Sequence, residues 1–362
     1  MPTLFDPISL GAIDAKNRVL MAPLTRARAE KSGVPTPIMA EYYAQRANAG
    51  VIISEATAIS RQAMGWIYAP GIWTKEQIEA WKPITEAVHA KGGKIVCQIW
   101  HMGRLVHSSV TGEQPVAPSP STAPGYTHTY DGKKSYEEAR ALSVDEIHEI
   151  VKDFGQAARN AIEAGFDGVQ IHGANGYLVD EFLRDGTNHR EDEYGGTPEK
   201  RLRFLREVTE SAIAAIGAER VGVRLSPNGE IQGAMDSKPE TVFVPAAQML
   251  QDLGVAWLEL RESSSQSTFQ LESPTDQPKL SPEIRKVFKR PLVLNQDYSP
   301  EEAKADVAEG RADAISFGRD YIANPDLAER LEKNLPLNED DISTWYGAWH
   351  GAKGYTDYPT AQ

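Results

Sequence analysis

The feature that most constrains the fold is an eight-fold alternation of short apolar segments with longer segments of helical character. The apolar segments are continuous rather than alternating in polarity, which is typical of strands covered on both faces of a parallel sheet. The eight predicted strands are residues 18–24, 50–56, 94–100, 167–173, 220–226, 255–261, 291–297 and 312–318.

The segments between these strands carry the start and stop signals of helices. Ser143 is followed three residues later by Glu146, which predicts a capping box, and Gly165 ends the same segment. The predicted helices are residues 37–49, 74–93, 143–165, 197–217, 238–254, 281–288, 299–310 and 324–334. Strand followed by helix, eight times over, predicts an α/β chain folded as a single (β/α)8 TIM-barrel domain over residues 1–362.

Two insertions interrupt this rhythm. Residues 105–140 follow the third predicted strand and are rich in proline, and residues 262–280 follow the sixth and are rich in serine. Both would lie at the carboxyl ends of the strands, where barrels build their active sites. They could be tolerated surface excursions, but the shared location favours loops that form a lid.

Composition excludes several classes of function. The formal net charge is −13, with 51 acidic against 38 basic residues, which argues against binding to nucleic acid or to an anionic membrane. No segment reaches the ~18 apolar residues of a membrane span, and the N-terminus does not read as a signal peptide, so we expect a cytoplasmic protein. The single cysteine, Cys97, lies in an apolar run and excludes a disulfide framework or a cysteine-rich metal site.

Polar side chains gather where the predicted strands end. His172 lies near the end of the fourth predicted strand, Asn175 and Tyr177 follow that strand, and only Gly and Ala separate the three. The strand ends carry no metal-ligand spacing, no serine nucleophile in an elbow and no isolated carboxylate pair, which favours a site whose chemistry belongs to a bound cofactor. Gly318 ends the last predicted strand and Arg319 follows it, ahead of a predicted helix, a position where barrels hold phosphate.

Several longer motifs carry a resemblance to a known family. They are "KNRVLMAPLTRAR" (16–28), "QIWHMGR" (98–104), "GFDGVQIHGANGYLVDEFLRDGTNHREDEYGG" (165–196) and "GYTDYP" (354–359). Together they resemble the Old Yellow Enzyme family of FMN-dependent ene-reductases, over a span from Leu4 to Pro359. The resemblance implies a TIM barrel with bound FMN, NADPH or NADH as hydride donor, and small electrophilic alkenes such as enones, maleimides and nitroalkenes as substrates.

The resemblance also implies which residues bind the flavin. Thr25 matches a hydroxyl that tunes the flavin, Gln98 the side chain at the pyrimidine edge, and Arg224 the cation beside N1 and the C2 carbonyl. The phosphate region matches Asn295, Gly318 and Arg319. The full implied set is Pro23, Leu24, Thr25, Ala58, Gln98, His172, Arg224, Asn295, Gly318 and Arg319.

The catalytic residues follow in the same way. His172 and Asn175 match two N–H donors that hold the activating oxygen of the substrate, and Tyr177 matches the proton donor on the face opposite the flavin, giving trans addition of hydrogen. Without the resemblance, His172 would be read as a core histidine and the aromatic residues as packing. The implied substrate pocket is Trp66, Tyr68, Trp100, Phe269 and Tyr346.

Other functions stay open at this point. A phosphate-binding aldolase or isomerase would want a base such as Glu55 or Glu259 at a strand end, or a Schiff-base lysine, which no strand end offers. A flavin-binding redox sensor, or a nitro or nitrate-ester reductase, could use the same site. Gly173 stands where the family often has Ala, Ala58 stands where Gly is frequent, and we expect a monomer or a homodimer.

Overall fold

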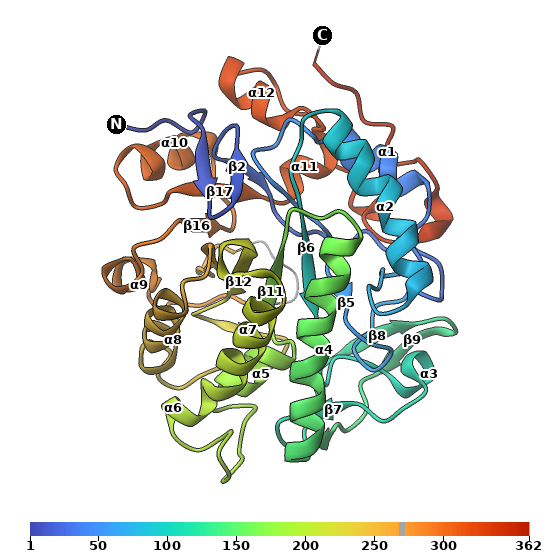
Figure 1. The fold of residues 1–362 in the computed structure, drawn as a ribbon, viewed down its shortest axis with the longest axis vertical. Helices are drawn as coiled ribbons and strands as arrows, with labels where there is room; N and C mark the ends of the chain where they lie inside the picture. The colour runs from blue at the N-terminus through green and yellow to red at the C-terminus, as the bar shows by residue number, and fades with distance from the viewer. Residues whose placement is uncertain (268–271, 362) are drawn as a thin grey trace.

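The computed structural model describes residues 1–267 and 272–361, and its centre is a closed barrel of eight parallel strands (Figure 1). Each strand pairs with the next along the chain, and the last returns to the first to close the barrel. Every strand lies inside its predicted range, so the TIM-barrel prediction is confirmed. The strands are β3 (Val19–Met21), β4 (Ile52–Ile53), β6 (Ile95–Trp100), β11 (Gly168–Gly173), β12 (Val221–Leu225), β14 (Trp257–Arg261), β16 (Leu292–Asn295) and β17 (Ala314–Phe317).

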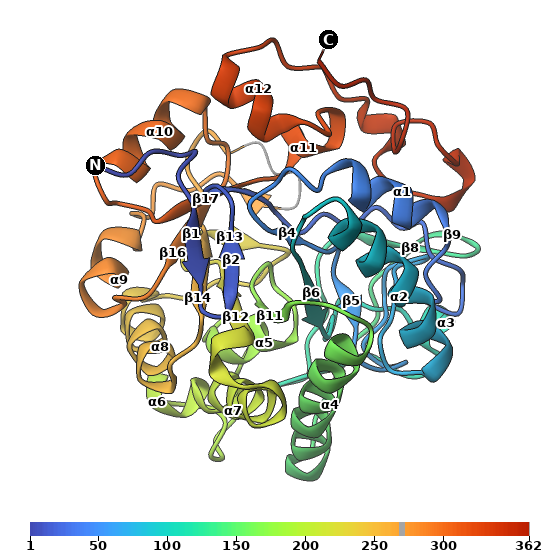
Figure 2. The same cartoon turned by 45° about the horizontal axis from the view of Figure 1, so that its top comes forward.

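Helices surround these strands (Figure 2). The predicted capping box of Ser143 and Glu146 is confirmed, whereas the helix predicted over 197–217 is divided at Leu202. The main helices are α1 (Ile38–Gln45), α2 (Lys75–Ala90), α4 (Val144–Glu163), α6 (Pro198–Arg201), α7 (Arg203–Ile216), α8 (Glu240–Leu253), α9 (Ser281–Val287), α10 (Pro300–Ala308) and α12 (Leu327–Lys333). Among the described residues, no helix has both the length and the apolar character that a membrane crossing requires.

The two ends of the barrel interior differ in polarity. Near the start of the strands, a hairpin of β1 (Ile8–Leu10) and β2 (Ile13–Ala15) packs into an apolar cluster that includes Trp257. Further along the strands the buried interior is polar, with Gln98, Gln170 and Glu259 all fully or almost fully buried. TIM barrels normally fill their interior with branched apolar side chains, so this polar layer marks the functional end.

The insertion after the third barrel strand is folded rather than irregular. It contains α3 (Ser108–Thr111) and an antiparallel hairpin of β8 (Tyr126–Thr129) and β9 (Gly132–Ser135). Two short strands, β7 (Val116–Ala117) and β10 (Arg140–Ala141), pair in parallel beside it. In the second insertion, β15 (Glu272–Ser273) pairs with β13 (Glu230–Ile231), so both insertions are tied down by strand pairing.

The C-terminal segment, which the sequence did not place, runs beside α1 (Figure 2). Two buried arginines hold it: Arg26 donates to the carbonyls of Trp345 and Gly354 at 2.9 and 2.7 Å, and Arg28 donates to that of Thr344 at 2.9 Å. Short 3-10 turns at Ile342–Thr344 and Ala348–His350 flank the residues that reach the mouth of the barrel.

Candidate active site

A cavity of about 620 Å³ opens at the carboxyl end of the barrel strands. Its volume lies in the range of cofactor and small-molecule sites. Residues that are almost 300 positions apart in the sequence meet in its wall because the parallel strands end at one face. The wall includes most of the predicted site residues: Pro23, Leu24, Thr25, Trp66, Gln98, Trp100, His172, Asn175, Tyr177, Arg224, Asn295, Gly318, Arg319 and Tyr346.

Three predicted residues are not among those that line the cavity. Ala58 belongs to β5 (Thr57–Ala58), which pairs with β6, and it is fully buried. The small residue that this segment contributes to the wall is Ala56, two positions earlier, so the wall favours Ala56 over the predicted Ala58. Tyr68 lies in an outer aromatic layer, edge-on to Tyr130 with ring centroids 5.4 Å apart. Phe269 lies outside the described residues.

His172, Trp100 and Tyr177 form a compact group in the cavity wall. The His172 ring lies near-parallel to that of Trp100 at 6.0 Å, and Tyr177 meets both rings edge-on at 4.9 and 4.7 Å. Tyr177 is placed there because it directly precedes the short helix α5 (Leu178–Leu183). Asn175 adopts a left-handed conformation with φ of 61°, which Asn tolerates better than most residues.

Three buried polar atoms of this part of the wall have no partner. They are His172 Nδ1, Asn175 Oδ1 and Trp100 Nε1, which make no hydrogen bond within the part of the chain that the structure describes. Buried polar atoms are normally paired, and such exceptions need an explanation. Since all three residues line the cavity, the explanation we favour is that a ligand in the cavity supplies the missing partners.

The protonation states of these residues follow from burial. Burial lowers the pKa of His172 well below its usual value, and the nearby charges of Arg224 and Arg261 lower this pKa further. The imidazole is therefore neutral near pH 7 and offers one N–H donor. Burial raises the pKa of Tyr177 above its usual value of about 10, so its hydroxyl keeps the proton.

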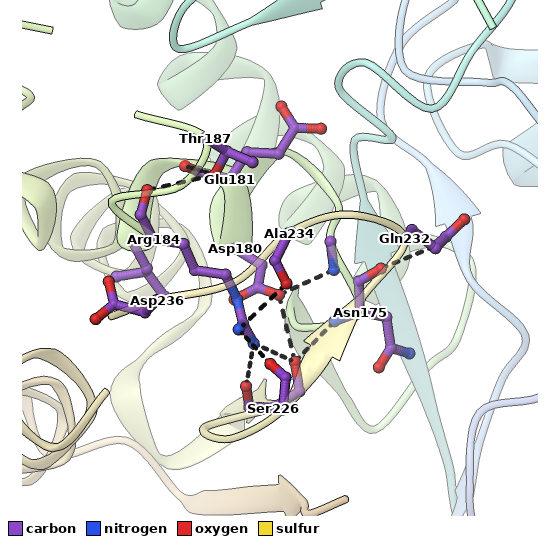
Figure 3. Close-up of polar contacts among 12 residues, drawn as sticks. Asn175, Asp180, Glu181, Arg184, Thr187, Ser226, Gln232, Ala234 and Asp236 are labelled. Carbon is purple, nitrogen blue, oxygen red and sulfur yellow. Dashed lines mark hydrogen bonds and ion pairs between the residues drawn. The ribbon is translucent and has the colours of Figure 1, made fainter. Parts of the chain in front are cut away.

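The loop that carries Asn175 is fixed by its backbone (Figure 3). The N–H of Asn175 donates to Ser226 Oγ at 2.9 Å, and its carbonyl accepts from Gln232 Nε2 at 2.9 Å. The next N–H, that of Gly176, donates to Asp180 Oδ2 at 2.9 Å. These three bonds leave the Asn175 side chain to face the cavity.

Arg184 joins this loop to the next strand connection (Figure 3). Its guanidinium is fully buried and donates to Asp180 Oδ1 at 2.8 Å, to the Gly229 carbonyl at 2.9 Å and to the Ser226 carbonyl. A buried charge of this kind is tolerated only when it is paired and hydrogen-bonded. The "DEFLR" part of the fourth-strand motif therefore supports the Asn175 loop from behind.

A second network crosses the barrel interior beneath the cavity, and the sequence did not predict it. Gln98 Nε2 donates to Gln170 Oε1 at 2.8 Å, and Gln170 Nε2 donates to Glu259 Oε2 at 2.6 Å. Glu259 Oε1 accepts from Arg224 Nη1 at 2.8 Å and from Ser316 Oγ at 2.6 Å. The signal was present in the sequence, since Gln170 and Glu259 each stand between two apolar residues of a buried strand.

The same contacts bear on an aldolase or isomerase function. Glu259 is tied to three donors, and Glu55 accepts from the backbone N–H groups of Arg26 and Ala27 at 3.2 and 3.1 Å. Both carboxylates thus have structural partners, and neither is among the residues that line the cavity. The structure offers no support for either as a catalytic base.

The hairpin β8–β9 and the C-terminal segment cover the mouth of the cavity. His128 of β8 stacks against Trp66 at 6.0 Å, and Tyr346 packs on Trp66 at 4.9 Å. The predicted lid after the third strand is confirmed by these contacts. The wall residues that the sequence did not single out are Ala22, Arg26, Ala56, Tyr126, Thr127, His128, Tyr136, Gln232, Arg261, Gln296, Asp297, Tyr298, Ser299, Ser316, Phe317, Asp320, Ile322 and Trp345.

Comparison with known proteins establishes the family. Residues 3–338 match the profile of the NADH:flavin oxidoreductase / NADH oxidase family. A solved Old Yellow Enzyme homologue from Zymomonas mobilis is 64% identical, with a TM-score of 0.97 and 99% of each chain covered. The chain belongs to the Old Yellow Enzyme family. It is therefore an FMN-containing, nicotinamide-dependent oxidoreductase.

Other members of the Old Yellow Enzyme family are also similar. Morphinone reductase, solved in complex with tetrahydroNAD, is 44% identical with a TM-score of 0.93, covering 100% of this chain and 98% of its own. The flavin oxidoreductase hxnT of Emericella nidulans is 42% identical over 99% of this chain and 98% of its own. The 12-oxophytodienoate reductase 2 of Arabidopsis thaliana is 40% identical, covering 99% and 96%.

Proposed function

We propose that this Old Yellow Enzyme family member is an ene-reductase, which uses NADPH or NADH to reduce the C=C bond of small electrophilic alkenes. One observation carries the proposal: the side chains of His172 and Asn175, which each carry an N–H donor, line the same cavity as the protonated hydroxyl of Tyr177. We also propose that the whole chain, 1–362, is one FMN-binding domain.

The residues of the cavity fit FMN. Thr25, Gln98 and Arg224 offer a hydroxyl, an amide and a cation for the polar edge of the ring, and Ala56 is the small residue that lies in the wall near it. The loops after β16 and β17 bring Asn295, Gly318 and Arg319 to the phosphate end. When bound, FMN supplies the hydride exchange between the nicotinamide and the alkene.

His172 and Asn175 bind the activating oxygen of the substrate. A carbonyl or nitro oxygen conjugated to the alkene gains negative charge as the C=C bond is reduced, and two fixed N–H donors stabilise that charge. A neutral imidazole suits this role because its proton stays on the ring and donates a hydrogen bond. The left-handed backbone of Asn175, held by Ser226 and Gln232, fixes the direction of the second donor.

Tyr177 holds the proton that completes the reduction. Its hydroxyl keeps that proton at neutral pH because burial raises its pKa, and it gives the proton to the α-carbon of the substrate. With the hydride arriving from the flavin face and the proton from the tyrosine face, addition is trans. The printed names of the relatives, morphinone reductase and 12-oxophytodienoate reductase, support a small organic molecule as substrate.

Anaerobic titration of the purified protein tests the proposal. NADPH should bleach the yellow flavin, and cyclohex-2-enone should then restore the oxidised spectrum within seconds. A protein that stays colourless with added FMN would contradict the proposed site. A flavin that NADPH reduces but that enones do not reoxidise would favour a redox sensor, and reoxidation by nitrate esters alone would favour a nitrate-ester reductase.

A further inference from the structure

The polar layer beneath the cavity contains one carboxylate, that of Glu259, which faces three hydrogen-bond donors and is fully buried. We propose that Glu259 is a positioning residue that sets both the amide direction of Gln98 and the net charge beside the polar edge of the flavin. The proposal rests on the FMN placement of the proposed function, and it adds a residue that does not itself line the cavity.

The amide direction follows from what each group can do. A carboxylate can only accept, so Gln170 must present Nε2 to Glu259 and is left with Oε1 toward Gln98. Gln98 must then donate Nε2 to Gln170, at 2.8 Å. The Gln98 Oε1 atom makes no hydrogen bond in the described part of the chain and remains as an acceptor at the cavity wall.

This direction matches the flavin ring. The pyrimidine edge of an isoalloxazine carries one N–H donor, N3, between two carbonyl acceptors. A free amide oxygen on Gln98 is the group that an N–H donor requires. A side-chain amide can present either its oxygen or its nitrogen. The Glu259 carboxylate, which can only accept, acts through Gln170 and so determines that Gln98 presents its oxygen to the cavity.

The charge follows from the ion pair. Arg224 Nη1 lies 2.8 Å from Glu259 Oε1, and Arg224 Nη2 donates to Asn295 Oδ1 at 2.8 Å. The neighbouring strands place these residues opposite each other, since Arg224 and Glu259 are register partners of β12 and β14. Within this pair a carboxylate partly balances the guanidinium, which lowers the net positive charge that Arg224 presents to the polar edge of the ring.

The variant Glu259→Gln separates this arrangement from simple packing. It keeps the size of the side chain and an acceptor for Arg224, but it removes the negative charge and adds a donor that faces Gln170. The reduced flavin is an anion, so an unbalanced Arg224 should stabilise it. We expect the reduced-to-oxidised ratio at a fixed potential to rise about tenfold, which is about +30 mV in midpoint potential for a two-electron couple.

The matched control moves the carboxylate one position along the same chain. In the double variant Glu259→Gln with Gln170→Glu, an acceptor-only group again faces the Gln98 amide and the net charge of the layer is restored. Its potential should lie within about threefold of wild type in reduced-to-oxidised ratio. Ser316→Ala removes one hydrogen bond from the same carboxylate without changing charge, and it should leave the potential within about twofold.

The measurement is a dye-equilibrated spectroscopic titration of each FMN-loaded enzyme, alongside a separate assay with NADPH and cyclohex-2-enone. An unchanged potential in FMN-loaded Glu259→Gln would overturn the proposal. If that variant does not fold, the double variant decides: a potential near wild type supports the proposal, and one displaced more than tenfold overturns it. FMN binding with the expected shift but no enone turnover would refute the proposed function and leave the role of Glu259 standing.

Discussion

The backbone N–H of Asn175 donates to the hydroxyl of Ser226 at 2.9 Å, across the gap between the fourth and fifth strand connections. Ser226 is fully buried, and its Oγ lies 3.3 Å from Asp180 Oδ2, so the hydroxyl can bond both groups. One small side chain thus joins the loop of the proposed oxygen donor to the Asp180–Arg184 pair beneath it.

Removing the Ser226 hydroxyl should weaken the positioning of Asn175 without changing the contacts of the flavin. In Ser226→Ala the Asn175 N–H loses its partner, and an unpaired buried N–H costs about 1–3 kcal/mol. We expect p-hydroxybenzaldehyde, a phenol that reports on the oxygen site, to bind about 5–50-fold more weakly by spectroscopic titration. FMN content should not change. Equal phenol affinity in Ser226→Ala and in the surface control Ser237→Ala would contradict this role.

Removing the donors themselves should have a larger effect. Deleting one oxyanion-type donor lowers the rate by about 10²–10³-fold, so His172→Ala and Asn175→Ala should each slow the oxidation of reduced enzyme by cyclohex-2-enone to that extent. The double variant should also abolish the long-wavelength charge-transfer band that phenolates give with the oxidised flavin. A persisting band would mean that the anion is bound by other residues.

Tyr177→Phe should separate the two half-reactions. The ring still packs against Trp100 and His172, so the cavity wall is kept, while the proton source is lost. General acid catalysis contributes about 10²–10⁴-fold, and we expect alkene reduction to slow within that range. Flavin reduction by NADPH should remain near wild type in stopped-flow traces. A similar loss in both half-reactions would point to damage of the cavity instead.

Much of the fold was predictable because periodicity reports directly on it. The eight apolar runs locate the barrel strands, and Ser143 with Glu146 locates the start of α4. The hairpin β1–β2 was missed because its strands have three residues each, too few to show a pattern. The division of the 197–217 helix at Leu202 was missed because no Gly or Pro marks it.

The site was predictable where a residue type carries its own chemistry. His172, Asn175 and Tyr177 stand out in sequence because three polar groups gather at the end of a buried strand. Ala56 and Ala58 could not be told apart in sequence because both are small residues of one segment, and only the folded wall shows that Ala56 lines the cavity. The partnership of Gln170 with Glu259 spans 89 residues, so only the closed barrel reveals it.

Acid should destabilise the enzyme through its buried histidines. Burial lowers the pKa of His101 to about 3, against an unfolded value of about 6.5. Below pH 6.5 His101 therefore binds a proton in the unfolded chain but not in the folded chain. The free energy of unfolding falls as the pH falls. Between pH 6.5 and 5 this one residue accounts for about 2 kcal/mol of that loss. Urea unfolding across this range should show a shallower pH slope in His101→Gln, and an unchanged slope would contradict the prediction.

Gly173 raises the last question, because the family resemblance implies Ala at this position. A Cβ on Gly173 would lie 3.0 Å from the Arg224 carbonyl oxygen and 3.1 Å from Leu225 Cδ2, so both neighbours would have to shift by a few tenths of an ångström. We expect Gly173→Ala to lower the free energy of unfolding by about 1 kcal/mol, at the mild end of overpacking. The donors should hold their places, because the Asn175 backbone is fixed by Ser226 and Gln232 and not by residue 173. Phenol affinity within about twofold of wild type, alongside a lower urea midpoint, is the expected result; a tenfold loss of affinity would show that the missing methyl is needed to keep the oxygen site open.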